Sequence, residues 1–188
     1  MHGLKWKAFV ALAIVVAGLF CGFPVETVNA LVTITETQIT PWVSETQITT
    51  DPESQFGTNI YGDIIVWADM RNGNQDIYMY DLSTGTETQI TTDPADQHTA
   101  RIYGNFIVWM DERNLNWDIY MYDLSTNTET QITTNTTSQM NPAIYGDIIV
   151  WEDYRNGNGD IYMYDLSTGG PATQITTNTA HQNVPCLW

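Results

Sequence analysis

Positive charge is scarce in this sequence. Its 188 residues include six lysine and arginine residues against 22 aspartate and glutamate residues, which gives a formal net charge of −16 at pH 7. No lysine follows residue 30, and the later positive charges are Arg71, Arg101, Arg113 and Arg155. Phosphate binding needs clustered Lys and Arg. The composition therefore argues against a nucleic-acid partner and suits a soluble extracellular protein whose charge maintains solubility.

Cysteine and histidine are scarce as well. Cys21 lies in a segment that we expect to be removed on export, which leaves Cys186 without a partner and predicts no disulfide. His98 and His181 are the histidines that follow residue 30, and they do not recur at a regular interval. The sequence shows no Ser-His-Asp set and no metal-binding His spacing. We therefore predict a non-enzymatic protein with no catalytic residue and no bound cofactor.

Long hydrophobic runs are limited to one, from Ala8 to Phe23. Lys5 and Lys7 precede it, and Ala30 follows as a small residue at a plausible cleavage point. This order is typical of a secretory signal peptide, and the run is short for a membrane span. We assign residues 1–30 as a signal peptide, which predicts an extracellular or cell-surface location with no membrane insertion after cleavage. A retained anchor is the alternative.

Internal repetition, by contrast, is abundant. Residues 45–86, 87–128 and 129–170 each open with Glu-Thr-Gln-Ile-Thr-Thr and carry Asp-Ile-Tyr-Met-Tyr-Asp-Leu near the end. Single anchors such as Tyr61 and Tyr103 recur every 42 residues. A period near 40 with strand-like content is typical of a β-propeller blade, one four-stranded sheet per repeat. The predicted fold is therefore all-β, built of propeller blades that are four-stranded antiparallel meanders.

The third repeat predicts the strands of a blade. Expected strands cover 141–145, 148–153, 160–166 and 173–177, separated by turns at Gly-Asp, Asn-Gly and Gly-Gly. The second strand is almost continuously apolar, which indicates burial on both faces. It carries one tryptophan in every repeat, for which we expect packing between blades, with ligand stacking as the alternative. These tryptophans are Trp67, Trp109 and Trp151.

The sequence predicts about three full blades, with a partial blade at each end. Residues 31–44 are interpreted as a degenerate repeat remnant or linker, 45–50 as an outer strand without a partner, and 171–188 as a partial fourth blade. Propellers usually close with four to eight blades. Three expectations follow: a truncated relative of a longer protein, self-association of chains to complete a ring, or an open stack with an exposed apolar flank.

The repeat resembles that of the TolB-like propeller family. Its third copy reads Asn-Pro-Ala-Ile-Tyr-Gly-Asp-Ile-Ile-Val-Trp-Glu-Asp-Tyr-Arg-Asn-Gly-Asn-Gly-Asp-Ile-Tyr-Met-Tyr-Asp-Leu. That family has a Pro-led strand, a Gly/Asp turn, an apolar strand, an Asp-Arg-containing turn and an Ile-Tyr strand in the same order. The tandem form is similar to archaeal cell-surface propeller proteins. The resemblance implies a surface location and says little about activity, because propellers carry many functions.

One polar set recurs on the loops that are expected to share a propeller face. We expect each Asp to form an exposed pair with the Arg two residues later while Asn-Gly makes the turn, and a calcium site is the alternative because carboxylates suit that ion. The candidate residues are Asp69, Arg71, Asp111, Arg113, Asp153 and Arg155.

The sequence as a whole predicts an exported cell-surface propeller module. Its expected role is non-catalytic binding or structure, towards a protein or an envelope glycan. Two alternatives are a fragment of a propeller enzyme, such as a polysaccharide lyase or a peptidase-associated propeller, and a truncated remnant without activity of its own.

Overall fold

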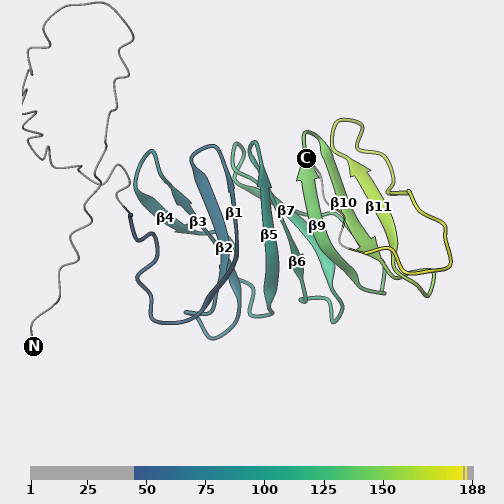
Figure 1. The fold of residues 1–188 in the computed structure, drawn as a ribbon, viewed down its shortest axis with the longest axis horizontal. Helices are drawn as coiled ribbons and strands as arrows, with labels where there is room; N and C mark the ends of the chain where they lie inside the picture. The colour runs from purple at the N-terminus through teal and green to yellow at the C-terminus, as the bar shows by residue number, and fades with distance from the viewer. Residues whose placement is uncertain (1–44, 184, 186–188) are drawn as a thin grey trace, which may run out of the picture. The chain divides into compact units, whose positions relative to one another are not determined.

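The computed structural model describes residues 45–183 and 185 and folds them into three four-stranded antiparallel sheets (Figure 1). The sheets lie within the compact unit Thr46–Trp188, and the other unit of the chain is Met1–Glu45. The expected signal peptide, 1–30, and the expected repeat remnant, 31–44, lie outside the described residues. Within the described part no helix forms, and so none there is long and apolar enough to span a membrane.

Each sheet is a blade whose strands follow one another in sequence order, as predicted. The strands of the first blade are β1 (Gln55–Tyr61), β2 (Ile64–Asp69), β3 (Asp76–Asp81) and β4 (Thr86–Gln89). Those of the second are β5 (Gln97–Tyr103), β6 (Phe106–Asp111), β7 (Asp118–Asp123) and β8 (Thr128–Gln131). Those of the third are β9 (Gln139–Tyr145), β10 (Ile148–Asp153), β11 (Asp160–Asp165) and β12 (Thr173–Gln174).

The outer strand of the third blade is shorter than the predicted 173–177. The hydroxyl of Thr176 accepts a hydrogen bond from the backbone nitrogen of Ile161 at 2.9 Å, where a ladder carbonyl would otherwise serve. The threonine hydroxyl therefore replaces a backbone carbonyl as the acceptor, and the backbone pairing of the strand ends there. The inner strand β9 is longer than the predicted 141–145, with a bulge in its pairing to β10.

The blades pack face to face, and their second strands form the core between them. Trp109 of β6 packs in one cluster with Val66 and Ile77 of the first blade. Trp151 of β10 packs in the next cluster with Val108 of the second blade. The prediction of packing between blades is confirmed for Trp109 and Trp151, whereas Trp67 is buried but borders a cavity. The near-continuous apolar run of the second strand reflects burial on both faces.

The expectation of an outer strand at residues 45–50 is wrong. These residues form no strand. Gln47, Ile48 and Thr49 instead line a cavity of about 460 Å³ together with Ile60 and Trp67 of the first blade. A strand needs a neighbour to pair with, and the strand that pairs with this hexapeptide in the other copies belongs to the preceding blade, as β3 does for β4.

Candidate functional site

The aspartate that ends each second strand is enclosed by hydrogen bonds. In the first blade, Asp69 Oδ1 accepts from the backbone nitrogen and Nε of Arg71, both at 3.0 Å. Its Oδ2 accepts from Arg71 Nη2 at 2.7 Å and from Trp67 Nε1 at 3.0 Å. The same four bonds recur in the other blades at Asp111 and Asp153. Each carboxylate therefore has its acceptor positions filled from within its own blade.

A stack of rings completes the arrangement. The guanidinium carbon of Arg71 lies 4.2 Å from the ring centre of Tyr78, which in turn stacks on Trp67 at 6.2 Å between centroids. Together Trp67, Asp69, Arg71 and Tyr78 form what we call the Trp–Asp–Arg–Tyr unit. Cation–π contact and the bidentate ion pair hold the guanidinium on two sides. The equivalent units are Trp109, Asp111, Arg113, Tyr120 and Trp151, Asp153, Arg155, Tyr162.

The burial of these carboxylates corrects the expectation of exposed pairs. Asp69, Asp111 and Asp153 are 0% exposed. Burial by itself raises the pKa of Asp69, but the hydrogen bonds from Arg71 and Trp67 outweigh it, so this pKa lies below its ordinary value. The carboxylate is thus held ionised inside the blade by its partners.

A second aspartate in each repeat is satisfied by neutral groups. Asp76 Oδ2 accepts from Asn72 Nδ2 at 2.9 Å and from Gln89 Nε2 at 3.1 Å, and Thr91 donates to its Oδ1 at 3.4 Å. The Thr91 hydroxyl also accepts from the backbone nitrogen of Ile77 at 2.8 Å. Sequence reasoning missed Gln89 and Thr91, although both belong to the repeated hexapeptide. Their recurrence in every copy was the available signal.

The loop aspartates make their contacts within their own blades. Each Asp–Arg pair lies within its own hairpin, and among residues 45–183 and 185 no three His, Cys, Asp or Glu side chains are grouped so that they could hold one. The arrangement is one structural unit per blade, repeated, instead of a ring of ligands around a common centre.

The two histidines lie in unrelated surroundings. His98 on β5 packs edge-on against Trp117, and burial lowers its pKa although Asp96 and Glu112 act in the opposite direction. His181 Nδ1 accepts from the backbone nitrogen of Gly159 at 2.9 Å. Neither histidine makes a hydrogen bond with a carboxylate or hydroxyl of the described residues, so the geometry supplies no oriented base there.

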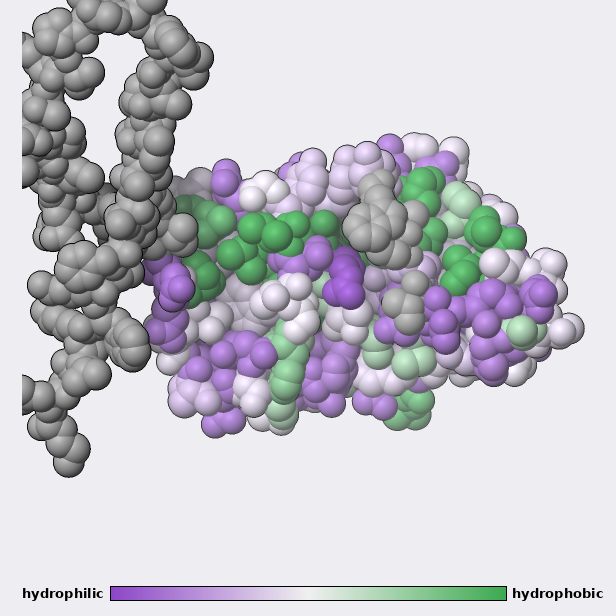
Figure 2. Space-filling view, viewed as in Figure 1, coloured by the Kyte–Doolittle hydropathy of each residue, from purple (hydrophilic) through white to green (hydrophobic). Residues whose placement is uncertain are grey.

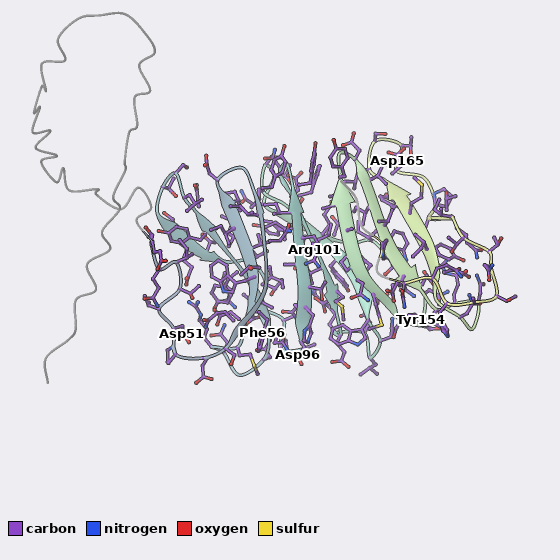
Figure 3. All side chains as sticks on the ribbon, in the orientation of Figure 1. Asp51, Phe56, Asp96, Arg101, Tyr154 and Asp165 are labelled. Atoms are coloured by element: carbon purple, nitrogen blue, oxygen red, sulfur yellow. The ribbon has the colours of Figure 1, made fainter. Side chains whose placement is uncertain are left out.

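Exposed aromatic rings gather at the opposite end of the inner strands. Tyr61, Tyr103 and Tyr145 end β1, β5 and β9, and we call them the tyrosine row. Their neighbouring centroids are 4.6 and 4.8 Å apart, and Tyr61 and Tyr145 are exposed. A groove of about 470 Å³ runs beside the row, with Ile60 and Arg101 in its lining. Figure 2 shows hydrophobic surface gathered over β1 and β2. Figure 3 places Arg101 on β5, in the second blade, between the first and third blades.

Comparison with known proteins identifies the fold. No protein-family model and no curated protein matches the sequence. TolB from Acinetobacter baumannii aligns with a TM-score of 0.57 and 22% identity over 72% of this chain and 36% of that chain. A TolB structure from Agrobacterium tumefaciens aligns with a TM-score of 0.56 and 19% identity over 68% of this chain and 50% of that chain. The acylaminoacyl peptidase of Pyrococcus horikoshii aligns with a TM-score of 0.55 and 17% identity over 69% of this chain and 21% of that chain.

The chain spans at most half the length of these two TolB chains. Identities of this size establish the fold and leave activity open. The three consecutive four-stranded meanders and the likeness to TolB agree. The described part of the chain therefore has a β-propeller fold, built of blades like those of TolB.

Proposed function

We propose that this chain is an exported, non-catalytic binding propeller of the cell envelope. The observation that carries the proposal is the tyrosine row: three aromatic rings contact one another in tilted pairs at one end of the inner strands and line a groove. Tyr61 and Tyr145 are exposed there. The buried aspartates of the polar loops accept all their hydrogen bonds from within their blades. The binding surface is therefore assigned to the row and not to these aspartates.

The chemistry of this surface favours a protein as the ligand. Tyrosine and arginine are enriched among the residues that dominate protein interfaces, and the groove offers both, with Arg101 beside Tyr103. The net charge of −16 disfavours nucleic acid. An envelope glycan is the other candidate, and the experiment separates the two.

The test measures binding of the purified protein to isolated cell envelopes. Changing Tyr61 and Tyr145 to serine should abolish binding, while Phe56→Ser, an equally exposed aromatic on the same strand β1, should leave it intact. Protease treatment of the envelopes should remove the binding and periodate oxidation of their glycans should not. The reverse pattern identifies a glycan, and binding that ignores the tyrosines refutes the assigned surface.

Export has a test of its own. If the signal peptide ends at Ala30, the protein recovered outside the cytoplasm begins at Leu31, which N-terminal sequencing detects. Intact protein beginning at Met1 in the soluble cytoplasmic fraction contradicts export.

A second copy of the chain is another candidate partner, supported by one comparison. Ile60 of the first blade is 57% exposed, whereas the equivalent Ile102 is 5% exposed because the preceding blade covers it. A head-to-tail contact would cover Ile60 in the same way. Solution mass measurement across protein concentrations should then show association that Ile60→Glu abolishes and Ile175→Glu, an exposed site on the outer side, does not. A monomer at every concentration contradicts this candidate.

A further inference from the structure

The arginine of the Trp–Asp–Arg–Tyr unit makes a third polar contact in two blades. Arg113 Nη1 donates to Glu129 on the outer strand β8 at 2.6 Å, and Arg71 Nη1 donates to Glu87 on β4 in the same way. In the third blade the residue equivalent to Glu129 is Ala172. The strand pairing shows this: Thr130 pairs with Met121 and Thr173 with Met163, and each threonine directly follows the position in question. The carboxylate that covers Nη1 elsewhere is replaced by a methyl group.

A second acidic neighbour is replaced in the same blade. Asp93 Oδ2 lies 3.9 Å from Arg113 Nε, and the residue 42 positions later is Asn135. Arg113 therefore faces Asp93, Asp111 and Glu129, whereas Arg155 has Asp153 alone among the described residues. The Arg155 side chain is 29% exposed against 21% for Arg113. Its guanidinium is compensated by one carboxylate in place of three.

A cavity lies beside this guanidinium. It has a volume of about 340 Å³, and Arg155, Thr134, Asn135, Pro171 and Ala172 line it. Arg155 Nη1, Asn135 Nδ2 and the Thr134 hydroxyl make no hydrogen bond with any described residue, so three donors are available to it. Its volume is at the lower end of the range for small-molecule sites, suited to a single side chain or small acid. Tyr154, labelled in Figure 3, marks the hairpin that carries Arg155.

We propose that this cavity, the Arg155 cavity, binds a carboxylate presented by an acidic side chain of a protein partner. The ligand class follows from the other blades, where a glutamate side chain from a neighbouring strand occupies the equivalent place on the guanidinium. A partner's glutamate or aspartate then supplies the contact that Ala172 does not. The site is separate from the tyrosine row, and the proposal does not depend on that surface.

The test uses N-acetyl-glutamate N-methylamide as the probe and its glutamine analogue as the neutral control. Titration followed by amide NMR should shift resonances at 133–135, 155 and 172 with the glutamate probe alone, and rising salt should weaken binding. Ala172→Glu should weaken it at least tenfold, because the new carboxylate occupies Nη1. Arg155 itself is left unchanged, since it also neutralises buried Asp153.

A variant that should gain a second binding site provides a test that does not depend on loss of binding. Asp93→Asn with Glu129→Ala gives the second blade the neutral surroundings of the third, and should raise the stoichiometry from one probe per chain to two. Asn135 opens the sequon Asn135-Thr136-Thr137, so the protein is made in a host that adds no N-glycan.

Three results with the glutamate probe would overturn the proposal. They are equal binding of the glutamate and glutamine probes, binding that Ala172→Glu leaves unchanged, and a stoichiometry that stays at one in the double variant. Glucuronate binding more tightly than the glutamate probe would assign the cavity to an acidic sugar and likewise refute a protein carboxylate.

Discussion

The second and third blades carry the same Trp–Asp–Arg–Tyr unit with the same hydrogen bonds, yet their arginines have different surroundings. Arg113 is enclosed by three carboxylates, and Arg155 by one together with a cavity. Repetition and specialisation are thus separable along this chain. Residues that all three copies share hold each sheet together, and positions at which one copy departs change the surroundings of its arginine.

The first and second blades differ in a second way. Trp109 packs against the preceding blade, whereas Trp67 borders a cavity of about 460 Å³ lined by Gln47, Ile48 and Thr49. The same residue in the same unit therefore has a complete neighbour in one blade and an incomplete one in the other. Substitutions at matched positions can measure what the neighbour contributes.

The largest effect is expected at these tryptophans. Trp109→Ala should lower the free energy of unfolding by about 3–5 kcal/mol, as for other buried aromatic truncations. Trp67→Ala should cost clearly less, because a cavity already borders its ring and fewer contacts are lost. Chemical denaturation measures both. Equal losses would indicate that the first blade is covered as fully as the second, as in a closed assembly.

The next effect concerns the buried carboxylate. Asp111→Asn should cost about 2–3 kcal/mol, because the amide cannot accept all four hydrogen bonds and the guanidinium loses the one carboxylate that contacts it in the buried interior. Asp123→Asn is the matched control: that turn aspartate is partly exposed and accepts from Ser125, a role that asparagine can fill. A loss below about 1 kcal/mol for Asp111→Asn would place the pair with ordinary surface ion pairs.

A smaller effect should distinguish the second blade from the third. Glu129→Ala removes a partly exposed ion pair and should cost about 0.5 kcal/mol. Ala172→Glu adds the equivalent pair and should raise stability by a similar amount. Thermal or chemical unfolding should show stability changes of opposite sign for the two variants. A destabilising Ala172→Glu would show that the outer strand of the third blade does not bring residue 172 to Arg155.

The smallest effect is the pH dependence of stability that His98 of the second blade contributes. Burial places the folded pKa of His98 below its unfolded value, so the unfolded chain binds the proton more readily. Stability should therefore be complete above the unfolded pKa, near 6.5, and should fall as pH drops from there through the folded pKa. His98→Met, which copies Met140 of the third blade, should flatten this part of the profile. An unchanged slope in the variant would assign the dependence to other groups.

Sequence reasoning located the strands well because their signals are local. β10, Ile148–Asp153, matches its predicted range, since an apolar run is bounded by a Gly-Asp turn and an Asn-Gly turn. The end of β12 could not be predicted in this way. It depends on the Thr176 hydroxyl reaching Ile161, a contact between segments 15 residues apart.

The candidate site was predicted in part. The pairing of Asp69 with Arg71 follows from their spacing, but the burial of Asp69 was missed. A strand places residues i and i+2 on one face, so the pattern Trp-X-Asp already put the indole and the carboxylate side by side. The roles of Gln89 and Thr91 required the fold, because the outer strand meets Asp76 through pairing with β3.

The central claim is that the buried aspartate of each Trp–Asp–Arg–Tyr unit is satisfied within its blade and does not bind a cation. The most direct measurement is hydrogen exchange of the indole N–H of Trp109 by NMR, assigned with a Trp109→Phe variant, without calcium and with millimolar calcium. The account predicts slow exchange and an unchanged resonance in both conditions, because Asp111 accepts from this indole at 3.0 Å in a fully buried place. Fast exchange, or a calcium-dependent shift that Asp111→Asn removes, would contradict it and make the aspartate a ligand-binding residue.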